Sequence, residues 1–306
     1  MLSRWLLSLG LLGALVWWLG PLELLDQLSG FDGTWLWLAL AIGLIQVMLS
    51  AFRWHFTARS LGLDLSFLAA WREYYLASLI NQVLPGGVVG DAYRAKRHAD
   101  QSTRRGRAWL AVVIERFSGQ LMLVILTLGV VVFSKTWHQA LTRWFPNLAL
   151  VSGVFIVIGL VLGLFILYSL LRRTNRWHVI ESGWIAPAIQ GVQQAFWPVG
   201  RLGVQLLSSG LILLSYIAIF VLAARAMGVE LPTTTLTILA PPLLLAMVIP
   251  ITVSGWGLRE AAAAGAWGIL GLDPAQGVAV SVAYGVLIFL IALPGVVLWR
   301  PVANPR

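Results

Sequence analysis

The residues whose types and spacing most favour a ligand-binding site lie in two short apolar segments. Both segments are interrupted by glycine and proline. The first covers residues 81–94 and reads N-Q-V-L-P-G-G-V-V-G-D-A-Y-R. Pro85 removes a backbone donor and ends the helix before it, and Gly86, Gly87 and Gly90 permit a positive φ and close approach of the backbone. A helix that begins near Gly90 would direct free N–H groups at an anionic group such as a lipid phosphate.

Three polar residues of this segment are candidates for binding such a group: Asn81, Asp91 and Arg94. Arg94 lies about one turn into the expected helix, where a guanidinium adds to the positive end of the helix dipole. Asp91 either caps that helix or pairs with Arg94. An ordinary cytoplasmic turn with ordinary capping is the alternative.

The second interrupted segment covers residues 250–260 and reads P-I-T-V-S-G-W-G-L-R-E. We expect a new helix after Ser254 or Gly255, with Arg259 and Glu260 in its first turns. Burying such a pair in an apolar region costs about 2.5–3.5 kcal/mol per charge unless it faces a cavity or a partner. The candidate site residues here are Pro250, Ser254, Gly255, Gly257, Arg259 and Glu260.

A third pair, Glu115 and Arg116, follows a short apolar run that begins at Ala108. If the helix enters the membrane at Ala108, Glu115 lies about 10 Å inside. If it enters at Phe117, the pair lies at the interface, and both positions stay open. Three arginines (Arg94, Arg116, Arg259) can form one basic cluster for a headgroup, with three carboxylates as partners or proton carriers (Asp91, Glu115, Glu260).

The elements that carry these residues are membrane helices. Of the 306 residues 59% are hydrophobic and 11% are charged, against about 25% charged in soluble domains. We predict an all-α polytopic membrane helix bundle, one domain over 1–306, with about six spanning helices. The spans are expected near residues 5–19, 34–52, 108–133, 149–171, 204–224 and 277–299. The broken segments 67–90 and 236–271 are expected to be re-entrant helical hairpins.

Composition also excludes several kinds of chemistry. The chain has no cysteine, so disulfides and thiolate chemistry are impossible. Its four histidines lie far apart, and no G-x4-G-K-[ST] motif occurs. We therefore expect no metal, no cofactor and no direct use of ATP. The net charge of +9 indicates basic loops at anionic lipid rather than nucleic acid.

The basic residues predict the orientation. Nine arginine and lysine residues lie between residues 53 and 107, whereas residues 20–33 contain none. Because basic loops stay in the cytoplasm, both termini are expected there, with residues 5–19 as a retained helix rather than a signal peptide. Six crossings then require that each broken segment enters and leaves on one side.

An internal duplication supports this arrangement. Residues 58–65 (A-R-S-L-G-L-D-L) align with residues 224–231 (A-R-A-M-G-V-E-L) at an offset of 166. The pattern P-x4-G-x3-R at Pro85 recurs at Pro250, at an offset of 165. We predict inverted repeats over about 34–133 and 204–299, an arrangement that transporters use for alternating access. The alternative is that short loops simply favour arginine, glycine and proline.

Residues 81–94, 115–119 (E-R-F-S-G) and 250–260 resemble the transmembrane flippase-like domain of the lysylphosphatidylglycerol synthase family, and the resemblance runs from about residue 4 to 300. It implies a bacterial inner-membrane protein that moves a lipid between leaflets. The lipid is an aminoacylated phosphatidylglycerol in the bifunctional members. By motif position, the resemblance places six charged residues in or near the central cavity: Asp91, Arg94, Glu115, Arg116, Arg259 and Glu260.

Bifunctional members continue into a soluble transferase domain, so we expect this chain, which ends at Arg306, to be a stand-alone member that does not make lysyl-lipid. We expect a transporter, not an enzyme, whose substrate is a phospholipid, an aminoacyl-phospholipid or a polyprenyl lipid. One alternative is a membrane-embedded lipid-linked transferase, against which the absence of a D-x-D motif counts. Another is a non-catalytic partner of a membrane enzyme; a homodimer is a further expectation.

Overall fold

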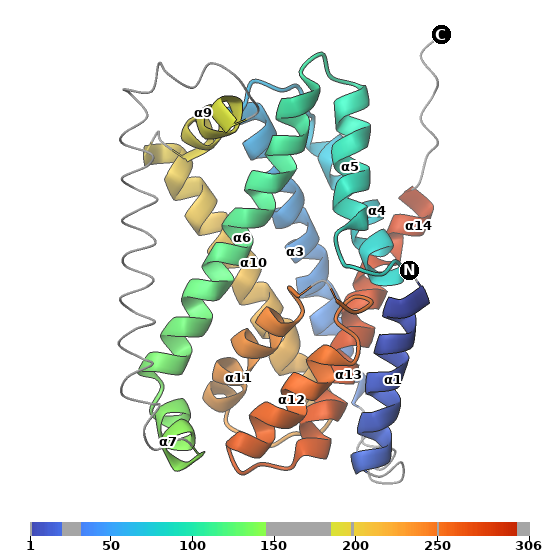
Figure 1. The fold of residues 1–306 in the computed structure, drawn as a ribbon, viewed down its shortest axis with the longest axis vertical. Helices are drawn as coiled ribbons and strands as arrows, with labels where there is room; N and C mark the ends of the chain where they lie inside the picture. Colours follow the sequence, from blue (N-terminus) through green and yellow to red (C-terminus); the bar gives the residue numbers. More distant parts are fainter. Residues whose placement is uncertain (1, 20–31, 145–184, 197–198, 250, 299–306) are drawn as a thin grey trace.

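The structure is a computed structural model that describes residues 2–19, 32–144, 185–196, 199–249 and 251–298. Within these residues the regular structure is helical, with one isolated β-bridge (Figure 1). The helices are α1 (Leu2–Leu19), α3 (Gly33–Ser60), α4 (Phe67–Val83), α5 (Val89–Asp100), α6 (Arg105–Phe133), α7 (Lys135–Trp144), α9 (Ile185–Phe196), α10 (Val199–Ala226), α11 (Thr233–Ala246), α12 (Leu258–Ile269), α13 (Pro274–Ala292) and α14 (Pro294–Leu298). The predicted all-α fold is confirmed.

Four helical stretches are long and apolar enough to cross a membrane: Gly33–Ser60, Arg105–Phe133, Gly200–Ala226 and Pro274–Leu298. They correspond to four of the six predicted spans. The first predicted span is the helix α1, whose apolar part, Leu9–Leu19, is shorter than a full span. The predicted span at 149–171 lies outside the described residues.

One predicted boundary is wrong. The second span was expected to end at residue 52, whereas α3 continues to Ser60. The polar side chains of Arg53 and Thr57 are buried against neighbouring helices, so they extend the helix inside the bundle instead of marking a loop. Arg53 therefore does not belong to the basic loop from which the orientation was predicted.

Two hairpins lie between the long helices, α4–α5 and α11–α12. Their helices contain 17, 12, 14 and 12 residues, about 18–26 Å at 1.5 Å per residue, which is too short for ~30 Å of hydrocarbon. In Figure 1, α4–α5 occupies the upper half of the bundle and α11–α12 the lower half, with their tips near mid-height. Both broken segments form helical hairpins, as predicted, with bounds of 67–100 and 233–269 in place of 67–90 and 236–271.

The helix order repeats along the chain. The first repeat is α3, α4, α5 and α6, and the second is α10, α11, α12 and α13. The ends of α3 and α10 and the starts of α4 and α11 each differ by 166 residues, and the starts of α5 and α12 and of α6 and α13 differ by 169. In Figure 1 the hairpins of the two repeats enter from opposite ends. The repeat is therefore inverted, and it positions two hairpin tips at one central place.

The helices α3 and α10 end in the same backbone motif. The N–H of Leu63 donates to the carbonyl of Ala58, and the N–H of Val229 donates to that of Ala224. Gly62 and Gly228 have φ values of +72° and +69°, a left-handed conformation in which glycine is favoured at helix C-termini. The sequence match of 58–65 with 224–231 is this one helix cap used twice.

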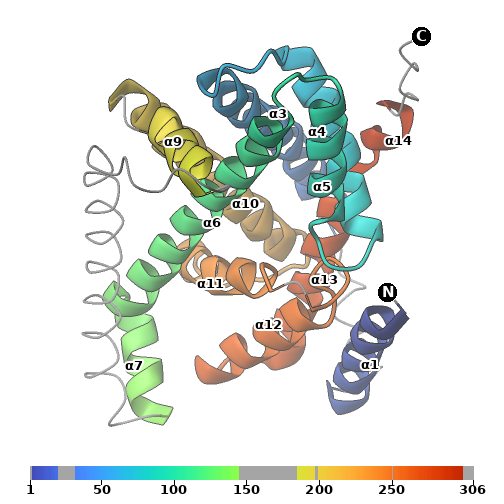
Figure 2. The same ribbon diagram turned by 45° about the horizontal axis from the view of Figure 1, so that its top comes forward.

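Shorter helices surround the repeats. Leu15 and Leu19 of α1 pack against Ala264 of α12 and Val278 of α13. Both views place α1 beside α12 and α14 beside α4, with α7 and α9 at opposite ends of the bundle (Figures 1 and 2). Gly295 of α14 approaches the backbone of α4 so closely that a Cβ there would lie 2.6 Å from the carbonyl oxygen of Tyr75. The helix α14 therefore packs on the first hairpin, and α1 packs on the second.

Candidate functional site

Glu115 is the centre of a buried group of charges that joins α3, α5 and α6. Its side chain is fully buried. One carboxylate oxygen accepts hydrogen bonds from Nε and NH2 of Arg53, at 3.1 and 2.5 Å. The other accepts from NH2 of Arg94 at 2.5 Å. Because α6 begins at Arg105, Glu115 lies about 15 Å along the helix, with its side chain inside the bundle.

Asp91 joins the remaining arginine to this group. Its carboxylate lies 3.0 Å from Arg94 and 2.6 Å from Arg116, and it accepts a hydrogen bond from the amide of Asn81 at 3.1 Å. Of its two predicted roles, Asp91 therefore has the ion-pairing one. We define the first cluster as Arg53, Asp91, Arg94, Glu115 and Arg116.

The start of α5 differs from the prediction of a free helix N-terminus. The N–H of Gly90 donates to the side-chain oxygen of Asn81 at 2.7 Å, so the hairpin satisfies this donor internally. A Cβ at Gly90 would lie 2.0 Å from the carbonyl oxygen of Ala77, which explains the need for glycine. Asn81 and Gly90 thus hold α4 against α5 and position Asp91.

Aromatic rings cover the most deeply buried guanidinium. Arg94 is fully buried, and its guanidinium carbon lies 4.5 Å from the ring centre of Trp54 and 4.7 Å from that of Tyr74. Such contacts stabilise a desolvated cation by up to about 2 kcal/mol. The NH1 group of Arg94 and the indole N–H of Trp54 are buried without a hydrogen-bond partner.

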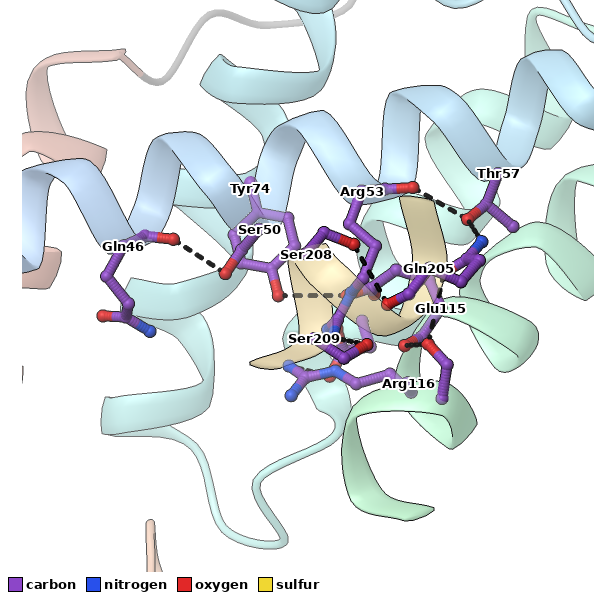
Figure 3. Close-up of polar contacts among 12 residues, drawn as sticks. Gln46, Ser50, Arg53, Thr57, Tyr74, Glu115, Arg116, Gln205, Ser208 and Ser209 are labelled. Atoms are coloured by element: carbon purple, nitrogen blue, oxygen red, sulfur yellow. Dashed lines mark hydrogen bonds and ion pairs between the residues drawn. The ribbon is translucent and has the colours of Figure 1, made fainter. Parts of the chain in front are cut away.

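A polar face of α10 completes the surroundings of the first cluster. Arg53 donates from NH1 to Ser209 at 3.0 Å, and Gln205 donates to Thr57 at 2.7 Å. Figure 3 shows Arg53 reaching from α3 toward Glu115 and Ser209, with α10 alongside. These residues were not predicted as part of the site, although polar side chains recur at helical spacing on both helices: Gln46, Ser50, Arg53 and Thr57 on α3, and Gln205, Ser208 and Ser209 on α10.

The second cluster lies on the other hairpin and consists of Arg259, Glu260 and Ser281. Nε and NH2 of Arg259 donate to one oxygen of Glu260, at 3.1 and 2.6 Å. The other oxygen accepts the N–H of Gly257 at 2.6 Å, which caps α12. Ser281 donates to Glu260 at 3.0 Å and accepts from Arg259 at 2.8 Å. Arg259 and Glu260 are both buried, so this cluster is closed on itself.

The predicted arginines therefore fall into two groups. Arg94 and Arg116 share Asp91, whereas Arg259 contacts Glu260 and Ser281 and lies over the rings of Trp256 and Tyr284. In the part of the chain that the structure describes, no ion pair joins Arg259 to Arg94 or Arg116. The described part of the chain also contains no group of three histidine, aspartate or glutamate side chains that could hold a metal ion.

The tips of the two hairpins contact each other. Pro85 and Val253 form the isolated antiparallel bridge, and the N–H of Gly86 donates to the carbonyl of Thr252 at 3.2 Å. The hydroxyl of Ser254 donates to the side chain of Gln82 at 2.6 Å. We call these contacts the tip contact.

Unusual backbone conformations shape both tips. Gly86 and Gly87 have φ values of +103° and +61°, and Gly255 and Gly257 have +81° and +86°. Ser254, at +50°, is the one non-glycine residue with a positive φ in the described chain, and its side chain makes the bond to Gln82. The predicted site residue Pro250 lies outside the described residues. The glycine-rich segments thus build the tip contact.

This architecture defines a multi-pass helical membrane protein, in which two inverted repeats bury arginine–carboxylate clusters beside opposed hairpin tips. The chain belongs to the family described as the lysylphosphatidylglycerol synthase TM region, which it matches over residues 5–295. No curated protein matches it, and neither does any solved structure. The family connects the protein to membrane lipids, in agreement with the resemblance of its motifs.

Proposed function

We propose that this protein moves an anionic or aminoacylated lipid across the bacterial inner membrane by alternating access. The observation that carries the proposal is the tip contact, because two hairpins from opposite ends of the bundle meet there beside buried arginines. Hairpins of inverted repeats that meet at the middle of a membrane protein are typical of transporter substrate sites. Both termini lie in the cytoplasm in this proposal.

The buried charges support a transport function. Three buried arginines (Arg53, Arg94 and Arg259) and the partly exposed Arg116 form ion pairs with three buried carboxylates in the described chain. A charged side chain within a membrane helix costs several kcal/mol, and such residues usually line a substrate path. Packing alone needs no such groups, because apolar residues of similar volume stabilise a core equally well.

In the proposed cycle the headgroup enters from one end of the bundle and binds at the clusters while the acyl chains stay in lipid. The tip contact closes the path to the other end. A shift of one repeat relative to the other then opens the tips and exposes the clusters to the second leaflet. The lipid gradient or an ion gradient drives this movement.

A transport assay with two matched variants of α5 tests the proposal. Purified protein is placed in liposomes that contain fluorescent phosphatidylglycerol, and dithionite bleaching measures movement between leaflets. The side chain of Arg94 is fully buried among the charges, whereas that of Lys96 is 71% exposed. We expect Arg94→Ala to lower the rate by about tenfold or more, since it removes a charge-assisted contact, and Lys96→Ala to keep it.

Size-exclusion profiles in detergent show whether both variants fold. Movement that is equally fast in Arg94→Ala and in the parent protein would remove the first cluster from the transport path. If the parent protein moves none of phosphatidylglycerol, lysyl-phosphatidylglycerol and a polyprenyl phosphate, the transport proposal is overturned, and a role as partner of a membrane enzyme takes its place.

A further inference from the structure

The inference concerns which headgroup the first cluster accepts, and it rests on the proposed function. Nine of the acidic residues lie in the described chain, and three of them are buried: Asp91, Glu115 and Glu260. Each of the three already pairs with at least one arginine. Among the described residues, no buried carboxylate is therefore left to bind the ammonium group of a lipid.

The arginines are in surplus in the first cluster alone. Three guanidinium groups (Arg53, Arg94 and Arg116) face two carboxylates (Asp91 and Glu115), so within the described chain one positive charge of this cluster has no counterpart. In the second cluster one guanidinium faces one carboxylate. A buried charge without a counterpart is unfavourable, and a ligand with a single negative charge balances the first cluster.

The free donors of the first cluster show where such a ligand contacts it. The side chain of Arg116 is 38% exposed, whereas those of Arg53 and Arg94 are at most 5% exposed. Nε of Arg116 and NH1 of Arg94 are buried atoms without a hydrogen-bond partner, and both arginines contact Asp91. A guanidinium with unused N–H groups matches the geometry of a phosphate, to which it can donate two parallel hydrogen bonds.

We propose that the first cluster binds a lipid headgroup with one phosphodiester charge and no amino group. Arg116 receives the phosphate at the accessible side, and NH1 of Arg94 completes its binding. Phosphatidylglycerol and a polyprenol that carries a sugar phosphate both have this chemistry. An aminoacylated phosphatidylglycerol adds ammonium groups that meet surplus arginine instead of a free carboxylate, and like charges in such a place weaken binding.

A comparison of transport rates for different headgroups tests the inference. Separate vesicles contain fluorescent phosphatidylglycerol, a polyprenyl sugar phosphate, phosphatidylethanolamine or lysyl-phosphatidylglycerol. We expect the first two lipids to move at least about tenfold faster than the two amino lipids. Equal or faster movement of lysyl-phosphatidylglycerol would overturn the inference and leave the transport function intact.

Binding is measured separately from transport, so that the two proposals can fail independently. The thermal stability of the purified protein in detergent is followed as each lipid is added. We expect phosphatidylglycerol to raise the unfolding temperature and lysyl-phosphatidylglycerol to leave it nearly unchanged. The reverse order contradicts the inference, even if no lipid crosses the bilayer.

Substitution of Arg116 tests the charge balance itself. Arg116→Gln removes the surplus charge, and we expect it to abolish the preference for anionic lipids in binding and transport. Arg116→Lys keeps the charge without the planar fork, and we expect it to retain the preference with weaker binding. Lys96→Gln is the exposed control on α5. If Arg116→Gln keeps the full preference for phosphatidylglycerol, Arg116 is not the phosphate contact.

Discussion

Glu115 connects two guanidinium groups from different helices, and this arrangement determines how the first cluster responds to substitution. Arg53 of α3 and Arg94 of α5 each hold one of its oxygens. A buried ion pair contributes little to the free energy of unfolding relative to apolar packing. Loss of one partner is costly, because the other charge then stays buried in a low dielectric without a counterpart. The stability of the cluster therefore depends on how many of its charges keep a partner.

The substitution Arg53→Leu tests this dependence. It leaves Glu115 paired with Arg94 and Asp91 paired with Arg116, so no carboxylate loses its last partner. We therefore expect a loss of stability below the about 3–5 kcal/mol that a broken buried ion pair costs. The double variant Arg53→Leu with Glu115→Gln removes both charges, so its loss is expected to be smaller than the sum of the single losses. Denaturant unfolding in mixed micelles measures the free energy of unfolding of Arg53→Leu, of Glu115→Gln and of the double variant. Strict additivity would show that Arg53 and Glu115 do not depend on each other.

At the scale of elements, backbone contacts hold the tips of the two hairpins together. The bridge of Pro85 with Val253 and the bond from Gly86 to Thr252 use main-chain groups. Opening this contact exposes one backbone donor and one acceptor, which an entering phosphate or water can satisfy. A contact of this kind can open without a large loss of apolar packing, as a gate in alternating access requires.

A cysteine pair at the tips tests whether the hairpins must separate. Cα atoms of directly opposed residues in an antiparallel bridge lie about 4.5–5.5 Å apart, which is within the range of a disulfide. The chain contains no cysteine, so Pro85→Cys with Val253→Cys introduces a single pair. We expect oxidation to stop lipid movement and reduction to restore it.

The two single-cysteine variants control for loss of Pro85 and Val253. Each is expected to transport under both oxidising and reducing conditions, since neither can form the crosslink. Full transport by the oxidised pair, with the crosslink verified by mass spectrometry, would show that the tips stay together during the cycle.

At the scale of the molecule, the inverted repeat makes a prediction about sidedness. The α5–α6 connection and the start of α11 lie at opposite ends of the bundle (Figure 1). Gln101 and Thr234 are exposed residues at these two places. We expect a membrane-impermeant maleimide to label Gln101→Cys from the cytoplasmic side and Thr234→Cys from the other side. Labelling of both from one side would contradict the inverted topology.

Local patterns were sufficient to predict much of this arrangement. Proline and glycine at 85–90 and 250–257 indicated the hairpins, and the offset of 166 indicated the repeat, because turns and helix caps depend on nearby residues. The burial of Glu115 beside Arg94 and Arg53 depends on how three helices pack. No spacing along the chain records that packing, so Arg53 was assigned to a loop.

The charged site residues were likewise predicted in part: local sequence identified them, but helix packing decides how they are grouped. Arg94, Arg116 and Arg259 were recognised because charge is rare in apolar segments. Their division into two clusters follows from the hairpins entering at opposite ends. The asymmetry of charge between the clusters follows from Arg53, whose spacing with Gln46, Ser50 and Thr57 marks a polar face of α3. A search for polar side chains at helical spacing would have identified it.

The sharing of Arg94 between two carboxylates has a consequence for the rate of transport. In the proposed cycle, Arg116 receives the phosphate and keeps Asp91 through its NH2 group. If Arg94 then turns to the phosphate, Asp91 still has Arg116 and Glu115 still has Arg53. No intermediate then contains a bare buried carboxylate, and the activation barrier for exchanging one anion for another stays low. In this cycle Arg94 is an exchangeable partner, and the proposal implies that the ease of that exchange sets how quickly the site loads and releases a lipid.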